Sequence, residues 1–367
     1  MRIMLLAAAD SIHAVRWADA FVQNGNEVHF VTLSEHREKK DVINPNVKMY
    51  YLRINGFKGY VLNSFELRRL WKEINPDVIS VHYASGYGLL ARYARIHPTV
   101  LSVWGSDVYV APYKSKLSKY IIKKNLNGAD AIASTSNVMA NQTRRIINDM
   151  RRDITITPFG VNINTFSPKE KKDSENIFRF GTIKKFTPIY GIENIIKAFG
   201  LFYQKWKIKG LGPIPHLFIC GKGPDGDKYK QLRDNLGLSD LVTIEGYVAN
   251  NKVPDLLNTF DVFCLGSISE SFGVSAVEAM ACGLPVIATD ADGFVEIIEN
   301  EHDGLIVPKN SIEEMAEKME ELYFDKSKCR MLGENARKKV IEKYNWSNNQ
   351  LLLINLLNSV ALTGKNK

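Results

Sequence analysis

Apolar runs of strand length alternate with amphipathic helical stretches along the whole chain. We expect strands at residues 2–8, 27–33, 47–53, 77–82, 99–104, 131–135, 177–183, 216–221, 241–247, 261–265, 286–289 and 304–308. We expect helices at residues 13–23, 64–74, 86–96, 113–126, 137–147, 191–206, 227–236, 252–258, 274–281, 312–323, 326–343 and 346–360. Continuous apolar strands separated by helices are typical of parallel sheets covered on both faces. The pattern therefore predicts an α/β fold.

A break in this alternation at residues 156–176 predicts two domains. The segment has two prolines, a glycine and a charged run, which is the composition of a linker. A length of 367 residues also suits two domains of ordinary size. We place the N-terminal domain at 1–160, the linker at 161–176, the C-terminal domain at 177–345 and a terminal helical segment at 346–367.

The overall composition is that of a globular protein, with 45% hydrophobic and 24% charged residues. No pair of the four cysteines has a metal-ligand spacing, so we expect free thiols in a reducing compartment. No apolar run reaches the roughly 18–20 residues of a membrane span. The first residues, MRIMLLAAAD, predict a buried strand rather than a secretory signal.

The net charge of +8 comes from the N-terminal half of the chain. Residues 1–167 contain 22 Lys+Arg and 13 Asp+Glu, whereas the remainder contains 26 and 27. Such a half should face a membrane surface, a phosphorylated acceptor or nucleic acid. Its basic helix suits an anionic bilayer and carries Lys114, Lys116, Lys119, Lys123 and Lys124 among apolar residues. Ordinary helix packing explains the same apolar face without a membrane.

The stretch ESFGVSAVEAMACGLPVIATDADG, residues 270–293, has the most specific pattern in the chain. Glu270 lies on the loop that leaves a strand, and Glu278 lies about a turn and a half into the helix that begins near Gly273. Backbone N–H groups at a helix N-terminus suit phosphate. The carboxylates can accept hydroxyl hydrogen bonds worth roughly 1.5–3 kcal/mol each. This arrangement fits a nucleotide diphosphate sugar, although an isolated E-x7-E would only indicate a helix cap and a solvated side chain.

The pattern E-S-F-G-x4-E followed by A-x-A-x-G-x-P-V-I-A-T resembles the signature of retaining glycosyltransferases of family 4, which have the GT-B fold. The resemblance implies two Rossmann-like domains whose parallel sheets face a central cleft, and a C-terminal helix that crosses back to the first domain. It also implies that Glu270 lies near the donor sugar and that Glu278 holds the ribose. The amides of Phe272, Gly273 and Val274 would approach the sugar and the diphosphate.

A second donor-binding loop follows the first strand of the C-terminal domain. Lys184 and Lys185 lie there, where cations would neutralise charge on a diphosphate. The family usually has Arg and Lys at the positions of Thr182 and Tyr190, so both positions depart from its pattern. The alternative for the two lysines is a solvated pair on a loop.

The sequence G-K-G-P-D-G at residues 221–226 mimics a dinucleotide-binding fingerprint, with Glu245 lying 19 positions beyond its last glycine. Its place in the middle of the chain and Pro224 in the turn argue against a dehydrogenase. In the family, G-x-G-P marks a loop that faces the donor nucleotide. We therefore assign Gly221 and Gly223 to donor binding through their backbone.

Asp290-Ala291-Asp292 is a D-x-D, a pattern that binds a metal in the other large glycosyltransferase fold. In the present family this position is a loop near the sugar, so we interpret it as a loop and expect no metal and no cofactor. The sequence has no other cluster of histidine, cysteine and carboxylate residues with metal-ligand spacing.

The N-terminal domain offers candidates for the acceptor side. Family members commonly carry H-G-x-D where this chain has W-G-S-D, so Trp104 replaces a histidine that lies near the reacting sugar. Asp107 is a candidate catalytic residue that orients the acceptor hydroxyl, with a helix N-cap as the alternative. His82 at a strand end and His13 at the start of the first helix could line the cleft, or they could be packed structural residues.

The resemblance implies a metal-independent retaining glycosyltransferase that uses a nucleotide sugar. UDP is the usual nucleotide in this family, and GDP is the alternative. The basic N-terminal domain favours a lipid-linked glycan acceptor, and a cytoplasmic protein held peripherally on the inner face of the membrane. We expect no nucleic-acid partner, because Tyr113 and Tyr120 are the only aromatic residues interleaved with the basic helix. The alternatives are a sugar-nucleotide epimerase of the same fold, a nucleic-acid-binding protein with Rossmann-like domains, and a relative that binds without catalysis.

Overall fold

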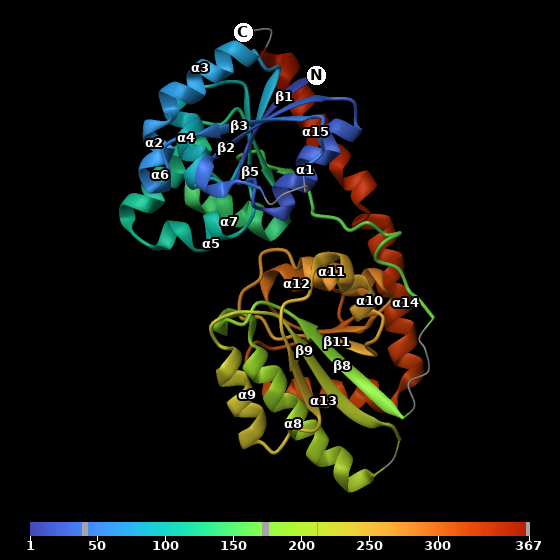
Figure 1. The fold of residues 1–367 in the computed structure, drawn as a ribbon. Helices are drawn as coiled ribbons and strands as arrows, with labels where there is room; N and C mark the ends of the chain where they lie inside the picture. Colours follow the sequence, from blue (N-terminus) through green and yellow to red (C-terminus); the bar gives the residue numbers. More distant parts are fainter. Residues whose placement is uncertain (39–42, 171–175, 211, 365–367) are drawn as a thin grey trace. The chain divides into compact units, whose positions relative to one another are not determined.

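The computed structural model describes residues 1–38, 43–170, 176–210 and 212–364 (Figure 1). The chain divides into two compact units. Unit 1 contains Met1–Pro158 and the described part of Asn348–Lys367, and unit 2 contains Phe159–Ser347. Residues 171–175 of the predicted linker and 365–367 of the predicted terminal segment lie outside the described residues.

Unit 1 is built on a seven-stranded parallel sheet with the order β3-β2-β1-β4-β5-β6-β7. Its strands are β1 (Arg2–Leu6), β2 (Glu27–Leu33), β3 (Val47–Leu52), β4 (Val78–His82), β5 (Thr99–Val103), β6 (Ala131–Ser134) and β7 (Thr155–Ile156). The winding direction reverses beside β1, because β2 and β4 pair with opposite edges of this strand. In open α/β sheets, ligands bind outside the carboxyl ends of the strands at such a reversal.

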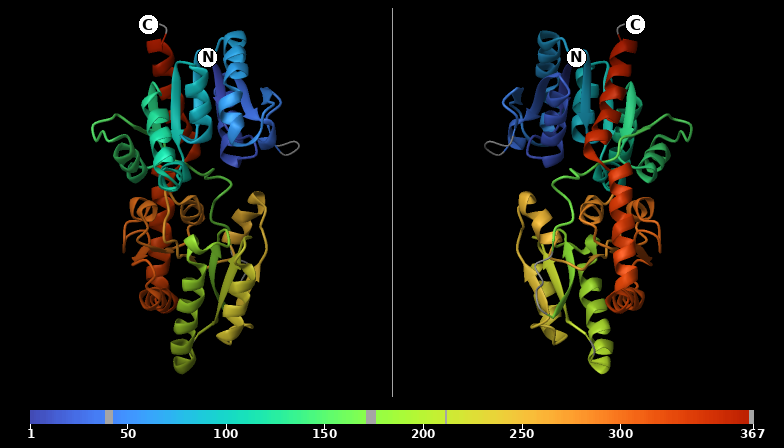
Figure 2. Two further views of the ribbon diagram at one scale, coloured as in Figure 1. Left: turned by 90° about the vertical axis from the view of Figure 1, so that its left-hand side faces the viewer. Right: turned by 90° about the vertical axis from the view of Figure 1, so that its right-hand side faces the viewer.

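The helices of unit 1 cover both faces of this sheet. They are α1 (Ile12–Gln23), α2 (Gly56–Leu62), α3 (Ser64–Ile74), α4 (Gly86–Ala94), α5 (Ser106–Tyr109), α6 (Lys116–Asn127), α7 (Asn137–Ile147) and most of α15 (Trp346–Gly364). Helices α2, α3 and α6 all pack against α4. The views in Figures 1 and 2 place these helices on one face and α1 with α15 on the other.

Unit 2 has a six-stranded parallel sheet with the order β10-β9-β8-β11-β12-β13. Its strands are β8 (Ile177–Ile183), β9 (Ile214–Cys220), β10 (Val242–Glu245), β11 (Val262–Leu265), β12 (Val286–Thr289) and β13 (Leu305–Val307). Its helices are α8 (Ile192–Lys209), α9 (Gly226–Asn235), α10 (Val253–Leu257), α11 (Val274–Ala281), α12 (Asp292–Ile297), α13 (Ile312–Phe324) and α14 (Lys326–Lys343). Helices α8, α9 and α13 pack together, and α11 packs with α14.

The α/β fold expected from the hydrophobic pattern is confirmed. Every expected strand is present with ends within two residues, and β1 is the buried first strand, with Ile3–Leu6 at 0% exposure. The pattern missed α2, α5, α12 and β7, which are short and carry too few residues for a period to be recognised. It also started helix α6 too early, since residues 111–113 form a 3-10 turn and Ser115 caps the helix by accepting from Ser118 N.

None of the described helices is both long enough and apolar enough to cross a bilayer. The terminal helix α15 buries Leu353 and Leu357, and its residues from Asn348 onwards belong to unit 1. The backbone of Gly364 approaches the ring of Pro98, where an added Cβ would lie 2.8 Å from Pro98 Cγ. The C-terminal helix therefore returns to the N-terminal unit, as expected.

The two ends of unit 2 are hydrogen-bonded to each other. Val161 N donates to Tyr344 O at 2.9 Å, and Trp346 N donates to Val161 O at 3.0 Å. Gly160 permits this approach, because a Cβ there would lie 2.7 Å from Tyr344 O. Arg337 of α14 fixes the following segment by donating to the carbonyl oxygens of Ile163 and Phe166. The segment that enters unit 2 is thus fastened to the segment that leaves it.

In unit 1, Asp107 fastens the loops that follow β4 and β5. Its Oδ2 accepts from Ala84 N at 2.9 Å, and its Oδ1 accepts from Trp104 N at 3.1 Å and Gly105 N at 2.9 Å. The residue is 1% exposed, and burial raises the pKa of this carboxyl while the three N–H groups oppose the rise. Asp107 thereby fixes the carboxyl ends of two neighbouring strands.

Asp107→Ala would leave three buried N–H groups without acceptors, and each unmade bond costs about 1–3 kcal/mol. We expect the variant to lose at least about 3 kcal/mol of unfolding free energy, measured by urea denaturation. The matched control is Asp153→Ala, because Asp153 is exposed in the same unit. It should change stability by less than about 0.5 kcal/mol. Equal stability of both variants would contradict the role given to Asp107.

Candidate active site

The candidate active site of unit 2 lies where β8 and β11 end. β8 lies in the middle of its sheet, with β9 on one side and β11 on the other. The loops that follow β8 and β11 therefore meet at the carboxyl edge of the sheet, where ligands bind in open α/β sheets. Lys184 directly follows β8, and Glu270 lies on the loop between β11 and α11.

These two side chains form an ion pair. Lys184 Nζ lies 2.7 Å from Glu270 Oε2, and the side chains are only 12% and 14% exposed. The ammonium group also lies over the ring of Tyr190, 4.9 Å from its centroid, and 5.8 Å from that of Phe294. An anion that entered here would find a lysine already held in place by two rings and a carboxylate.

The structure separates the two lysines that the sequence had treated as a pair. Lys184 joins Glu270, whereas the side chain of Lys185 is exposed on the same loop. The structure also shows where Thr182 and Tyr190 lie, the two residues that depart from the family pattern. Thr182 is fully buried within β8, with its Oγ1 lacking a hydrogen-bond partner, and Tyr190 covers the Lys184 ammonium group. Tyr190 thus places an aromatic ring beside the Lys184 ammonium group, at a position where the family usually has a lysine.

Gly221 and Gly223 bring the loop after β9 against the loop after β8. Lys184 N donates to Cys220 O at 3.0 Å, and Phe186 N donates to Lys222 O at 3.1 Å. A Cβ at Gly221 would lie 1.8 Å from Lys184 O, and one at Gly223 would lie 2.2 Å from Phe186 O. Only glycine allows this contact. Contact of these glycines with a donor remains a prediction. Their packing against the loop after β8 fixes the backbone position of Lys184.

The loop that carries Glu270 is packed just as tightly against α12. Gly293 N donates to Glu270 O at 2.9 Å, and a Cβ at Gly293 would lie 2.7 Å from Phe272 N. Gly273 precedes α11 with φ of 107°, a conformation that favours glycine. Helix α11 then places Glu278 half-buried on its second turn. Burial, with the charge of Glu278 as a second cause, raises the pKa of Cys282 to about 12.

The side chain of Phe272 is a packing residue. It is 5% exposed, and its ring meets the rings of Phe159 and Tyr344 edge-on at centroid distances of 5.8 and 5.9 Å. Any contact of Phe272 with a donor would therefore involve its backbone. Val274 is the first residue of α11, so its N–H belongs to the first turn of that helix.

The acceptor-side candidates of unit 1 lie together. Trp104 contacts His82 at a centroid distance of 4.5 Å, Tyr83 at 5.3 Å and His13 at 5.9 Å. These residues come from α1, from the last residue of β4 and from the loops that follow β4 and β5. Tyr83 has φ of 75°, which costs a non-glycine residue energy and is typical of functional loops. Sequence reasoning missed Tyr83, whose only signal was its place next to His82.

Both histidines in this group are neutral near pH 7. Burial lowers the pKa of His82 to about 3 and, with the charge of Arg16 as a second cause, lowers the pKa of His13 to about 4. His82 Nε2 contacts Ser80 Oγ at 3.0 Å, while its buried Nδ1 has no hydrogen-bond partner. Asp107 stabilises the loops that carry this group, because both of its carboxylate oxygens accept hydrogen bonds from backbone N–H groups of these loops. The geometry gives Asp107 a positioning role.

The D-x-D of residues 290–292 is part of a folded turn. Asp290 Oδ1 accepts from Lys309 N at 2.8 Å, and Asp292 is the first residue of α12 rather than part of a loop. The expectation of a loop was therefore wrong for Asp292, because Phe294 N donates to Ala291 O and starts a helical turn. Both carboxylates are exposed.

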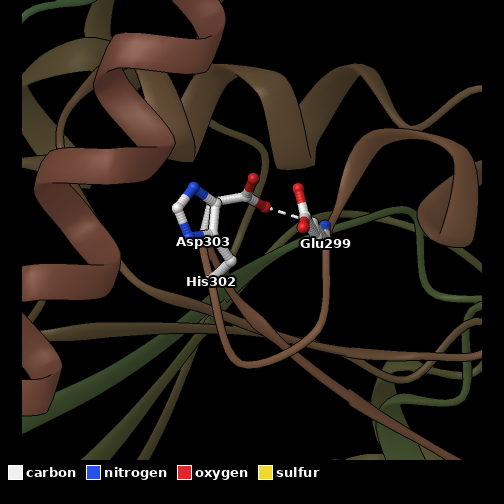
Figure 3. A group of neighbouring side chains, drawn as sticks. All are labelled: Glu299, His302 and Asp303. Carbon is white, nitrogen blue, oxygen red and sulfur yellow. Dashed lines mark hydrogen bonds between the residues drawn. The ribbon is translucent and has the colours of Figure 1, made fainter.

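Three ligand-type side chains gather nearby at Glu299, His302 and Asp303 (Figure 3), with their polar atoms within 4.8 Å of one another. Asp303 is fully buried, and its Oδ1 accepts from Glu299 N at 2.9 Å. Lys339 forms an ion pair with the same carboxylate and neutralises it. Asp303 therefore stabilises the turn between α12 and β13. Sequence reasoning missed this group because the three residues have no spacing typical of a metal site.

Comparisons with known proteins agree with this geometry. The model of glycosyl transferases group 1 matches residues 163–339, and the glycosyl transferase 4-like model matches residues 2–136. N-acetyl-alpha-D-glucosaminyl L-malate synthase of Bacillus anthracis is 26% identical over 347 residues, which cover 88% of this chain and 86% of that protein. Alpha-monoglucosyldiacylglycerol synthase of Acholeplasma laidlawii is 25% identical over 321 residues, which cover 78% of each chain.

Solved structures show the same fold. Sucrose-phosphate synthase from Thermosynechococcus elongatus has a TM-score of 0.85 at 20% identity and covers 99% of this chain and 100% of its own. HepE of Anabaena, in complex with UDP, has a TM-score of 0.79 at 17% identity and covers 98% of this chain and 99% of its own. The two family models together span most of both units. The chain belongs to the group 1 glycosyl transferases and is a glycosyltransferase of the GT-B fold.

Proposed function

We propose that this glycosyltransferase transfers a sugar from a UDP-sugar to a lipid-linked glycan, with retention of configuration. The observation that supports it most is the Lys184–Glu270 pair at the carboxyl ends of β8 and β11, with Glu278 on the adjoining helix. UDP follows from the family resemblance, and HepE, which shares the fold, was solved with UDP. A lipid acceptor agrees with the diacylglycerol product in the name of the Acholeplasma relative.

Donor binding exchanges the partners of Lys184. In the free chain its ammonium group is paired with Glu270. The diphosphate of a donor carries more negative charge than a carboxylate, so it competes for this ammonium and leaves Glu270 to accept from a sugar hydroxyl. Glu278 accepts from the ribose diol. Lys184 and the N–H groups that begin α11 then stabilise the charge that develops on the departing diphosphate.

Acceptor binding falls to unit 1. His13, His82 and Trp104 form its group. The neutral imidazole of the half-buried His13 can hydrogen-bond to a hydroxyl without introducing charge, whereas His82 is fully buried. In a retaining reaction, the acceptor hydroxyl attacks on the face from which the diphosphate leaves. The protein's contribution is mainly positioning and electrostatic stabilisation, so neither a metal nor a cofactor is required.

The enzyme works at the inner face of the membrane, held there by helix α6. Lys116, Lys119 and Lys124 are exposed on this helix, together with Leu117 at 66% and Tyr120 at 58% exposure. Ile122 points the other way and is 2% exposed. The outer face is therefore both basic and partly apolar, which suits an anionic bilayer.

Glu278→Ala removes the carboxylate assigned to the ribose diol. We expect the Kd for free UDP to rise at least about tenfold, because a hydrogen bond to a charged group is worth roughly 1.5–3 kcal/mol. Isothermal titration calorimetry measures the change. Glu313→Ala is the control, since Glu313 is exposed in the first turn of α13. Unchanged affinity in a folded Glu278→Ala protein would rule out the ribose assignment.

Glu270→Gln should reduce kcat by about 100-fold, because the residue acts on the sugar as charge develops. Affinity for free UDP should stay the same or improve, since Lys184 would lose its anionic partner and be released for the diphosphate. Steady-state kinetics and calorimetry on the same preparation separate the two effects. Loss of UDP binding with turnover of bound donor preserved would mean that the roles of Glu270 and Glu278 are reversed.

Lys116→Glu with Lys119→Glu should weaken binding to anionic vesicles by about tenfold or more at low salt, because each basic residue contributes about 1 kcal/mol near such a surface. Lys123 is left unchanged because it is half-buried. Vesicle sedimentation measures the effect, and UDP affinity serves as the control. Equal binding of the wild type to neutral and anionic vesicles would contradict the electrostatic role of α6.

A further inference from the structure

The corner between α2 and α3 exposes large apolar side chains to solvent. Phe65 is 85% exposed, Phe57 72%, Leu62 54% and Ile54 39%. Single exposed apolar residues are normal on a protein surface, but a group of four within residues 54–65 marks an interaction site. Nothing in the proposed reaction uses these residues.

This corner has a defined internal structure. Asn63 is 1% exposed, its Nδ2 donates to Ile54 O at 2.8 Å, and its Oδ1 accepts from Ile54 N at 3.2 Å. The side-chain amide thus closes the chain from residue 54 to residue 63 into a ring. Gly59 lies inside that ring, where a Cβ would be 2.2 Å from Ile54 O. The backbone beside the two exposed phenylalanine residues is therefore fixed by the fold.

The charges beside these rings are mostly positive. Phe65, Arg68, Arg69 and Lys72 occupy positions i, i+3, i+4 and i+7 of α3, and all four are exposed. Of the acidic residues on the same helix, Glu66 is half-buried and Glu73 is paired with Arg69 at 3.4 Å. Arg53 and Lys58 add two more exposed cations at the corner itself. The outer surface combines apolar rings with cations, as interfacial membrane helices do.

The corner also belongs to the same layer as the basic helix α6. Helices α2, α3 and α6 all pack against α4, and Figure 1 shows them on one side of the unit 1 sheet. A bilayer in contact with α6 would therefore meet the layer of helices that also carries the exposed rings of the corner. The apolar corner supplies what the lysines of α6 lack, because electrostatic attraction is screened by salt whereas burial of apolar surface is not.

We propose that Phe57, Leu62 and Phe65 insert into the boundary between headgroups and acyl chains of an anionic membrane, while Arg68, Arg69 and Lys72 bind its phosphate groups. This site goes beyond the proposed attraction of α6 to the membrane and rests on it only for the choice of bilayer. It predicts a part of membrane binding that persists at high salt. It also limits how deeply unit 1 sits, because Asn63 fixes the backbone from residue 54 to residue 63.

The test uses the full chain and vesicles of phosphatidylglycerol and phosphatidylcholine, without donor or acceptor. Phe57→Ser with Phe65→Ser should lower vesicle binding by about tenfold or more at both low and high salt, since each phenylalanine loses its apolar transfer into the interface. Ile208→Ser is the matched control, because Ile208 is 88% exposed on α8 of unit 2. It should bind vesicles as the wild type does. Unchanged binding by the double variant would overturn the proposal.

A second readout reports insertion directly. In Phe65→Trp, the emission of the new indole should shift to the blue on anionic vesicles and be quenched by brominated acyl chains. Emission that stays unshifted while the protein binds would overturn insertion. A wild type that sediments as a dimer, with the double serine variant as a monomer, would identify the corner as an interface between copies. These measurements do not depend on sugar transfer. They therefore test membrane insertion even if the proposed reaction is wrong.

Discussion

The ion pair between Lys184 and Glu270 is the constraint on which the candidate site of unit 2 depends. Two charges that are each less than 15% exposed require partners, because burying an unpaired charge is costly. The pair holds the loops after β8 and β11 in register before any ligand arrives. In the proposed reaction a donor would replace this interaction, so the net gain from binding its diphosphate would be a difference between two charge pairs.

Close backbone contacts make that ion pair geometrically feasible. Gly191 and Gly266 touch through their backbones, and a Cβ at Gly191 would lie 1.8 Å from Gly266 O. Gly221 and Gly293 serve the neighbouring loops in the same way. These glycines form the carboxyl edge of the sheet, where four loops crowd together. The dense packing leaves backbone N–H groups and a few polar side chains as the accessible chemistry, which suits a ligand rich in phosphate and hydroxyl groups.

The candidate site of unit 1 differs from that of unit 2 in its chemistry. The strand ends of unit 1 bring together two neutral imidazoles, an indole and a carboxylate occupied by backbone N–H groups. Uncharged donors and acceptors beside aromatic rings suit a hydroxyl-rich acceptor. The positive charge of this unit lies instead on its outer helices, where cations and exposed aromatic rings suit an anionic surface.

The sequence by itself determined the strands, the two-sheet architecture and the motif around Glu270, because apolar period and glycine–proline punctuation are local properties. It could not separate Lys184 from Lys185, since adjacent residues on a loop differ only in which one the fold turns inward. It read Gly221 as a ligand contact and left the role of Asp107 open between catalysis and capping. Only the tertiary structure showed that the glycine admits a neighbouring carbonyl and that the carboxylate binds loops from two strands, because both roles depend on contacts between segments distant in sequence.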